Sequence, residues 1–247
     1  MKADPAAQLK LLDVQELDSH VDQLRHQRAR LPELAEIAEL TAKRTDVDNL
    51  ARDARITVDD LTTEQKKVDL DVEAVKTRRT RDRDRMDQGL ITNPKDLERM
   101  QHELQSLERR ISSLEDDELE VMEKIEEAQK ELVQYETMVA ETDERLTALA
   151  VARDEKVAAI DEQLQDLAAR RGPAGEGLPD DLVALYQRLR EQKGGVGAAA
   201  LRARTCTGCQ LTLDSVELSR IKALPEDEVV RCEECNRILV RTSESGL

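Results

Sequence analysis

The sequence predicts a mainly α protein in which a long antiparallel coiled-coil hairpin precedes a small C-terminal β module. Three observations support this fold class. Charged residues make up 37% of the 247 residues, and Phe and Trp are absent, a composition typical of long helices. Apolar residues recur at alternating steps of three and four along much of the chain. All four cysteines lie near the C-terminus in two Cys-x-x-Cys pairs.

The second long helix has the clearest heptad pattern. From Leu97 to Leu167, alternating steps of three and four residues reach 21 positions, of which 16 are apolar. This repeat indicates the a/d seam of a coiled coil. Asn93 can cap the helix with Pro94 in its first position, and Gly172-Pro173 is expected to end it.

The first long helix shows the same period more weakly. Apolar residues recur there at every seventh position, namely Val47, Ala54, Leu61, Val68 and Val75. Only a short turn near residues 88–94 separates the two helices, and a short connection makes neighbouring helices antiparallel. Residues 1–171 are therefore predicted to form the hairpin.

An irregularity is expected where Pro32 falls within the first helix. Antiparallel pairing about the turn places Pro32 opposite residues 150–153, close to where Arg153 and Lys156 interrupt the other seam. Proline removes a helical hydrogen bond and kinks a helix. We therefore predict a bend or local opening of the hairpin near Pro32, against the alternative of a defect that the helix tolerates.

Residues 172–197 are predicted to form a linker that contains a short helix at 179–193. A glycine-rich stretch precedes this helix, and a proline followed by two aspartates is typical of a helix start. Tyr186, Arg188 and Arg190 on the short helix are candidate partner contacts. For Tyr186 the alternative is a tyrosine packed in the core.

The four cysteines, Cys206, Cys209, Cys232 and Cys235, are the most specific chemical feature of the chain. Each Cys-x-x-Cys turn points two thiolates at one centre, and two such turns together give the tetrahedral S4 site that suits zinc. We predict one structural Zn²⁺ in a β zinc ribbon at residues 198–243. The alternatives are two disulfides or four unrelated core thiols.

The predicted ribbon lacks aromatic residues for a core, so it is expected to depend on the metal for folding. Removal of any one cysteine should unfold residues 201–243 and leave the coiled coil intact. Zinc knuckles often place glycine directly after the second cysteine, where the backbone becomes left-handed. Gln210 and Asn236 hold those positions here, and asparagine tolerates that conformation better than glutamine does.

Charge patterning identifies two further candidate contact surfaces. The net charge of −16 argues against nucleic-acid binding over the whole surface. Basic residues nevertheless crowd the predicted hairpin tip, at Lys76, Arg78, Arg79, Arg81, Arg83 and Arg85. This tip can dock on an acidic partner or on phosphates, and the alternative is a solvated face with ion pairs inside the helix. Arg202 and Arg204 are the candidate contacts on the ribbon.

These features resemble a known bacterial family, the C4-type zinc-ribbon proteins with a long N-terminal coiled-coil hairpin. The resemblance covers most of the chain and is carried by the following motifs: Asn93-Pro94-Lys95-Asp96-Leu97, Tyr186-Gln187-Arg188-Leu189-Arg190, the Gly194–Gly197 linker, Cys206-Thr207-Gly208-Cys209 and Cys232-Glu233-Glu234-Cys235-Asn236-Arg237-Ile238-Leu239. The family usually has glycine where this sequence has Asn236. The composition, rich in Arg and Ala, is similar to that of the actinobacterial branch. The resemblance implies a protein without known catalysis, and members have been tied to protein partners and to RNA.

The function that follows from these patterns is that of a non-catalytic zinc-binding adaptor or chaperone-like protein. It is expected to bind protein partners through the coiled-coil arm and the ribbon. The alternative is an RNA- or DNA-binding zinc-ribbon protein that regulates transcription or translation. An enzyme is not expected, because four cysteines leave zinc no open position and the three histidines lie in the coiled-coil region. No small-molecule substrate is evident.

The expected location is the cytoplasm. Residues Met1–Lys10 lack the apolar segment of a signal peptide, and the longest run without a charge, Thr205–Leu213, is too short to span a bilayer. Reduced thiols in that compartment favour a metal over disulfides. The chain is expected to be a monomer or a weak homodimer, because open heptads on two helices can pair with a second copy.

Overall fold

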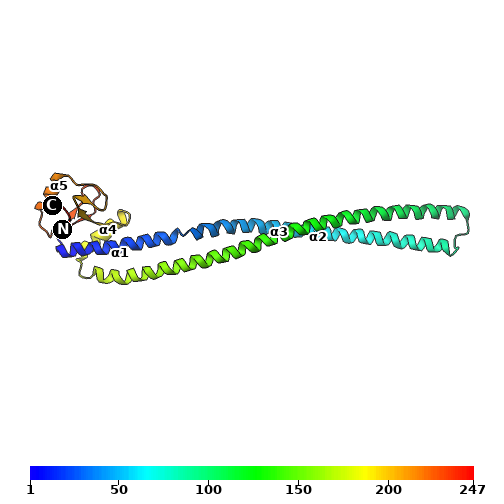
Figure 1. Ribbon diagram of the computed structural model, residues 1–247, viewed down its shortest axis with the longest axis horizontal. Helices are drawn as coiled ribbons and strands as arrows, with labels where there is room; N and C mark the ends of the chain where they lie inside the picture. The colour runs from blue at the N-terminus through cyan, green and yellow to red at the C-terminus, as the bar shows by residue number, and fades with distance from the viewer. The chain divides into compact units, whose positions relative to one another are not determined.

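The computed structural model describes residues 1–247, which form two compact units. One unit, called the base here, comprises Met1–Leu34 and Val151–Leu247, and the other, called the arm, comprises Ala35–Ala150. The elements follow in the order α1 (Pro5–Ala29), α2 (Pro32–Asp87), α3 (Pro94–Gly175), α4 (Asp180–Gln192), β1 (Ala198–Arg202), β2 (Thr205–Cys206), α5 (Ser215–Ala223), β3 (Val230–Arg231) and β4 (Ile238–Arg241). The predicted fold class, long helices in a hairpin with a small C-terminal β region, is confirmed (Figure 1). None of the helices has a stretch that is both long enough and apolar enough to cross a membrane.

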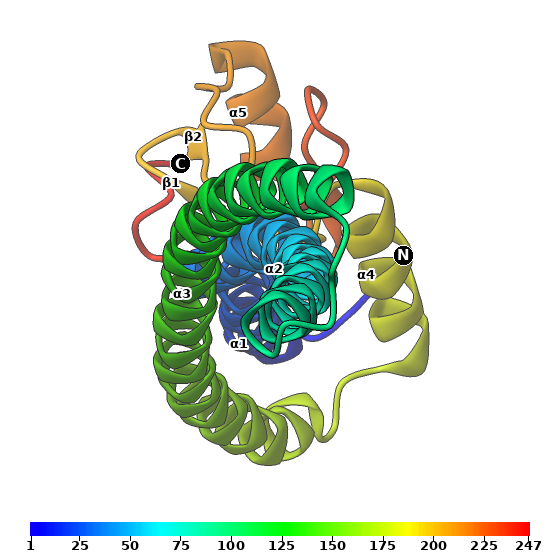
Figure 2. The ribbon, with the colours of Figure 1, turned by 90° about the vertical axis from the view of Figure 1, so that its right-hand side faces the viewer.

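The arm consists of the antiparallel parts of α2 and α3 with the loop that joins them. Its buried apolar side chains are Ala51, Ala54 and Val72 on α2, and Leu107, Ile111, Leu114, Val121, Ile125, Ala128 and Leu149 on α3. All seven buried apolar residues of α3 in the arm belong to the predicted heptad seam, whereas Ala51 and Val72 of α2 were not in the seven-residue repeat predicted there. Figure 2 shows α3 curving around α2 in this unit. The side chain of Asn93 accepts a hydrogen bond from the Lys95 backbone N–H at 3.0 Å, which confirms the predicted cap.

Ion pairs between the two helices flank the buried seam of the arm. The pairs are Arg44–Asp143 at 2.5 Å, Arg55–Glu136 at 2.5 Å, Lys76–Glu115 at 2.8 Å and Arg145–Glu36 at 2.7 Å. The side chains in these pairs are at least 36% exposed, and exposed pairs of this kind stabilise a fold by about 0–1 kcal/mol each. Their main effect is therefore to favour one register of the hairpin over others.

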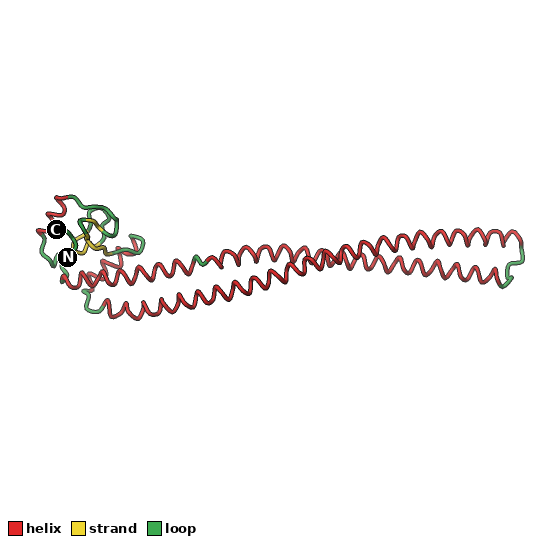
Figure 3. Tube along the Cα trace, viewed as in Figure 1, coloured by secondary structure: helices red, strands yellow, loops and turns green.

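Within the base, the first helical region is interrupted beside Pro32. Helix α1 ends at Ala29 and α2 begins at Pro32, which leaves a short non-helical step (green in Figure 3). A proline disfavours helical backbone in the residue before it and is tolerated in the first position of a new helix. Glu33 forms an ion pair with Lys156, so the break lies beside the polar interruption of the α3 seam.

The C-terminal end of α3 differs from the prediction. Gly172-Pro173 was expected to end this helix, and residues 1–171 were assigned to the hairpin, but α3 continues through Pro173 to Gly175. Proline this close to a helix end removes a single backbone hydrogen bond. The carbonyl that loses its partner belongs to the exposed Ala169, where water can satisfy it.

A four-stranded sheet in the order β2-β1-β4-β3 forms the centre of the base. Strand β1 is parallel to β4 and antiparallel to β2, and β3 is antiparallel to β4. Side chains alternate between the two faces of β1 and β4. Ala198, Ile238 and Val240 face a cluster with Leu11, Val14, Leu182, Tyr186 and Leu189 of α1 and α4. Ala199, Leu201 and Leu239 face a second cluster that contains Cys206, Cys232, Leu213, Ile221 and Val230.

The buried amide of Gln15 joins α1 to the segment that leads into β1. Its Oε1 accepts hydrogen bonds from the backbone N–H groups of Gly197 at 2.7 Å and Ala198 at 3.2 Å. Its Nε2 donates to the Gly195 carbonyl at 3.0 Å and to the Ser19 hydroxyl at 2.8 Å. One side chain thus satisfies three backbone groups. Leaving such groups unpaired in a buried position would destabilise the fold.

A second buried polar contact joins α1, α3 and α4 around Asp18, which is only 4% exposed. Arg171 donates to its carboxylate through Nε at 2.6 Å and Nη2 at 3.2 Å, and the Tyr186 hydroxyl donates at 2.8 Å. Burial opposes ionisation of Asp18, but the hydrogen bonds from Arg171 and Tyr186 outweigh it and lower its pKa. Burial is the main cause that raises the pKa of Tyr186 well above its usual range, and the hydrogen bond to Asp18 is the second. The hydroxyl therefore remains a donor.

We expect Asp18→Asn to destabilise the base by about 1–3 kcal/mol at pH 7, because Arg171 and Tyr186 lose a charged acceptor. Urea unfolding can be followed by tyrosine fluorescence in a Tyr135→Phe background, where Tyr186 is the remaining fluorophore. Asp13→Asn is the matched control, since Asp13 is an exposed aspartate on the same helix. Equal midpoints for the Asp18→Asn and Asp13→Asn proteins would show that the buried contact does not stabilise the base.

Gly197→Ala is expected to destabilise the contact between α4 and β1 by about 1–3 kcal/mol. A Cβ atom at this position would lie 2.5 Å from the Tyr186 carbonyl oxygen and 3.0 Å from the Arg190 backbone nitrogen, and neither backbone atom can move aside freely. Gly172→Ala is the control, because nothing lies within 4 Å of its Cβ position and alanine favours the helix. Thermal unfolding of the two variants should shift in opposite directions.

Candidate metal centre

The two Cys-x-x-Cys turns have the same backbone design. In the first turn the carbonyl of Cys206 accepts from the Gln210 N–H at 2.8 Å, and in the second the carbonyl of Cys232 accepts from the Asn236 N–H at 2.8 Å. Gln210 and Asn236 have φ angles of 62° and 64°, so the left-handed conformation predicted after each second cysteine is confirmed. Each turn therefore presents its two thiols on the same side of the backbone.

The four sulfur atoms converge on one point. Cys206 Sγ lies 3.9 Å from Cys235 Sγ, Cys209 Sγ lies 3.9 Å from Cys232 Sγ, and all four lie within 4.8 Å of one another. A disulfide would need a separation of about 2.05 Å, so the alternative of two disulfides does not describe this structure. Four sulfurs bound to zinc at about 2.3 Å in a tetrahedron are separated by roughly 3.8 Å.

The electrostatic environment of the thiols also fits a divalent cation. Burial raises the pKa of Cys206, and it raises the pKa of Cys232 to about 12. For Cys235 burial acts in the same direction, but hydrogen bonds from the Arg237 backbone and side chain and from neighbouring thiols lower the pKa to about 7. Four clustered thiolates repel one another, and a bound Zn²⁺ offsets that repulsion and holds them deprotonated.

The residues present therefore fit one structural zinc ion with Cys206, Cys209, Cys232 and Cys235 as its ligands. The first two ligands flank the end of β2, and the second two lie between β3 and β4. Four protein ligands complete the usual coordination shell of zinc, whereas catalytic sites keep a position for water or substrate. The arrangement supports a structural role for the metal.

At the hairpin tip, the structure pairs several of the basic residues with carboxylates. Arg78 contacts Glu103 and Asp82, Arg81 contacts Asp82 at 3.1 Å, and Lys76 contacts Glu115 at 2.8 Å. Asp82 is 4% exposed, so it is a buried acceptor inside the tip. The pairs with Asp82 lie inside α2, as the alternative described, whereas Lys76 and Arg78 also pair across to Glu115 and Glu103 of α3.

The remaining basic residues of the tip differ from one another. Arg79 is half-buried, whereas Arg83 and Arg85 are exposed and form no ion pair. These two arginines, together with the exposed Leu90 in the loop, are the part of the tip that is free to contact another molecule.

For Tyr186 the structure supports the alternative of a core tyrosine over a partner contact. Tyr186 is 1% exposed and packs between α1 and β1, as the core alternative described. Arg190 also faces inward, where it donates to Asp22 at 2.5 Å and to the Asp18 carbonyl at 3.4 Å. Arg188 points away from this contact and is exposed.

The two candidate arginines of the ribbon are both exposed, but they have different partners. Arg202 forms an ion pair with Glu244. Arg204 has only the Gly246 carbonyl at 3.4 Å and no carboxylate.

Sequence reasoning missed Gln15 and Asp18, which position the helices against the ribbon. A usable indication was present, because both polar residues lie on the helical face of Leu11 and Val14. A polar residue on an apolar helical face predicts either a defect or a buried hydrogen bond. The partners of Asp18 on α3 and α4, and the Gly197 N–H that binds Gln15, lie more than 150 positions away in the sequence.

The fold and the site define a class of proteins in which a coiled-coil hairpin is joined to a closed C4 zinc ribbon. Residues 14–194 match the CT398-like coiled-coil hairpin domain, and residues 205–239 match the C4-type zinc ribbon domain. The chain belongs to the CT398-like coiled-coil hairpin family. The resemblance drawn from the sequence is therefore confirmed.

Individual relatives agree with this assignment. The uncharacterized protein Rv2229c of Mycobacterium tuberculosis is 35% identical over 241 residues, which cover 98% of both chains. A solved structure from Mycobacterium smegmatis is 35% identical with a TM-score of 0.85, and the match covers 98% of this chain and 100% of that one. The structure of CT398 from Chlamydia trachomatis has the same fold, with a TM-score of 0.70 at 20% identity over 96% and 98% of the two chains.

Purified protein is expected to contain one zinc ion per chain, and Cys232→Ser is expected to lose it. Because the ribbon core contains the ligands themselves, its folding depends on the metal. Elemental analysis checks the metal, and circular dichroism should show that most of the helix signal remains in the variant. Glu234→Gln, an exposed change in the same turn, is the control and should retain zinc. A Cys232→Ser protein with a full zinc ion would contradict the four-cysteine assignment.

Proposed function

We propose that the chain is a non-catalytic zinc-binding adaptor that binds protein partners through its arm and its base. The observation that carries this proposal is an apolar stripe on α3 outside the hairpin seam. Leu119, Met122 and Val133 are 59%, 40% and 60% exposed. They are spaced by 3 and 11 residues and lie within about 60° of one another around α3, and Glu126 and Gln129 lie on the same face between Met122 and Val133.

The rest of the arm makes this stripe notable. The seam buries the apolar residues that hold the hairpin together, and the stripe lies outside it with much of its apolar surface exposed. Single exposed apolar residues are normal, but apolar residues aligned on one helical face are typical of a protein contact. An amphipathic helix of a partner is the kind of element that packs on such a stripe.

Two features support a non-catalytic role. The zinc centre has its four cysteine ligands and no position for a substrate or water. The three histidines, His20, His26 and His102, lie on α1 and α3, away from the metal ligands in the sequence and outside the ribbon.

Nucleic-acid binding is the second candidate, favoured by exposed cations without a carboxylate partner. These cations include Arg83 and Arg85 at the tip and Arg188, Arg204 and Lys222 in the base. Against it stand the net charge of −16 and the burial of Tyr186, which removes a stacking platform for bases. We expect no binding of mixed-sequence RNA or duplex DNA near physiological salt. Micromolar binding that falls steeply with salt and is lost in an Arg83→Glu, Arg85→Glu variant would favour this second candidate.

Photo-crosslinking tests the adaptor function directly. A benzophenone amino acid placed at Met122 or Val133 is expected to capture a defined protein partner in cells. The same group at Glu127, an exposed position on another face of α3, is the control and should capture less. Met122→Glu with Val133→Glu should abolish co-purification of that partner while the helix content is unchanged. Equal capture from Glu127 and from the stripe, or no capture at all, would contradict the proposal.

A further inference from the structure

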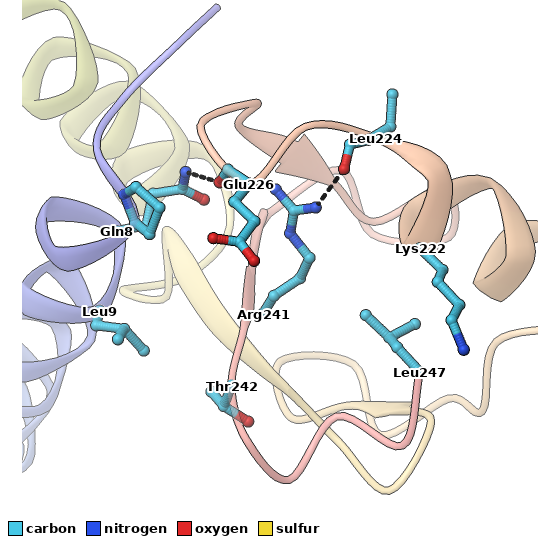
Figure 4. Close-up of a pocket in the computed structure, with 9 residues that line it drawn as sticks. Gln8, Leu9, Lys222, Leu224, Glu226, Arg241, Thr242 and Leu247 are labelled. Atoms are coloured by element: carbon cyan, nitrogen blue, oxygen red, sulfur yellow. Dashed lines mark hydrogen bonds between the residues drawn. The ribbon is translucent and has the colours of Figure 1, made fainter.

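A groove in the base lies between the N-terminal turns of α1 and the end of α5. It encloses about 350 Å³, and its apolar lining consists of Leu9 on one side and Leu224 and Leu247 on the other (Figure 4). Leu9 and Leu247 are 46% and 37% exposed, so two apolar side chains of the groove are accessible to a partner. A smaller hollow of about 190 Å³ adjoins it, and the two share Lys222 and Leu247.

The two ends of this groove carry opposite charges. Glu226 lies at the end near Gln8 and Leu9, whereas Lys222 lies at the other end beside Leu247 (Figure 4). Arg204 lines the adjoining hollow beyond Lys222. Lys222 and Arg204 are exposed and form no ion pair, in a chain in which acidic residues outnumber basic ones by 54 to 38.

Arg241 adds a fixed positive charge to the wall of the groove. Its guanidinium donates to five backbone carbonyl oxygens, those of Ile221, Leu224, Pro225, Glu226 and Glu228. It forms no ion pair with a carboxylate, although the Glu226 side chain lines the same groove. The side chain is therefore rigid and already satisfied, and it attracts an anion without needing to bind it directly.

We propose that this groove binds an extended acidic peptide segment of the partner protein, with a leucine-like side chain between Leu9 and Leu247. Charge complementarity selects this occupant and sets its direction. The carboxylates of the segment lie at the Lys222 and Arg204 end, because Glu226 repels them at the other end. The inference rests on the proposed adaptor function and names the chemistry of the partner at the base.

Fluorescence anisotropy with defined peptides tests the proposal on the zinc-loaded full chain. The probe is a short labelled peptide with one leucine followed by aspartates. Two matched peptides replace the aspartates with lysines or the leucine with serine. The acidic leucine peptide is expected to bind about tenfold more tightly than either matched peptide. Similar affinities for the acidic and the lysine peptides would overturn the proposal, as would a preference for a short RNA of the same length.

Variants of the groove test the direction of binding. Lys222→Glu with Arg204→Glu should weaken the acidic peptide by about tenfold, and Lys222→Gln with Arg204→Gln should weaken it less. Glu226→Gln should leave the affinity unchanged or improve it. Arg188→Glu is the control, since Arg188 is an exposed arginine of the base that does not line the groove.

The outcomes distinguish this inference from the adaptor function on which it rests. Unaltered binding of the acidic peptide to the Lys222→Glu, Arg204→Glu protein would overturn the groove assignment. Capture of a partner from Met122 and Val133 would still support the adaptor function in that case. Loss of all partner capture from the full chain would instead contradict the adaptor function itself.

Discussion

The structure of the base depends on the pairing of β1 with β4, because this short parallel pair carries an apolar cluster on each of its faces. One face packs against α1 and α4, and the other contains Cys206 and Cys232. A sheet with two-residue edge strands and no aromatic residue on its metal side has little apolar area to hold it together. The zinc centre supplies that missing stabilisation, and the helices on the opposite face are thereby linked to the metal through the strands.

The arm and the base are stabilised by different kinds of interaction. The arm has a repetitive seam of aliphatic residues bordered by exposed ion pairs. Each ion pair stabilises the folded hairpin only slightly, but together the pairs favour one register. The base has few repeats and instead depends on long-range polar contacts that satisfy buried groups, those of Gln15 and Asp18 above all. Its groove and the apolar residues exposed on the arm differ in chemistry, because the groove is lined by charged side chains as well as leucines.

The sequence predicts the features that depend on local spacing. The heptad seam of α3 and the four zinc ligands repeat at fixed intervals, and the Asn93 cap and the left-handed residues Gln210 and Asn236 follow from neighbouring positions. It does not predict the inward orientation of Tyr186, since the acceptor Asp18 lies 168 residues away. The continuation of α3 through Pro173 was also missed, because this proline lies close to the helix end and removes only one hydrogen bond there. The groove between α1 and α5 is lined by segments from both ends of the chain, so no local sequence pattern predicts it.

Hydrogen exchange with and without zinc tests the central claim most directly. On removal of the metal by a chelator, we expect backbone amides of β1 and β4 to lose protection, and those of α4 to follow because its cluster packs on the same strands. Amides in the buried seam of the arm, such as those near Ile111 and Ile125, should remain protected. Protection of β1 and β4 that is unchanged without zinc would contradict the account, because the strands would then hold both clusters without the metal.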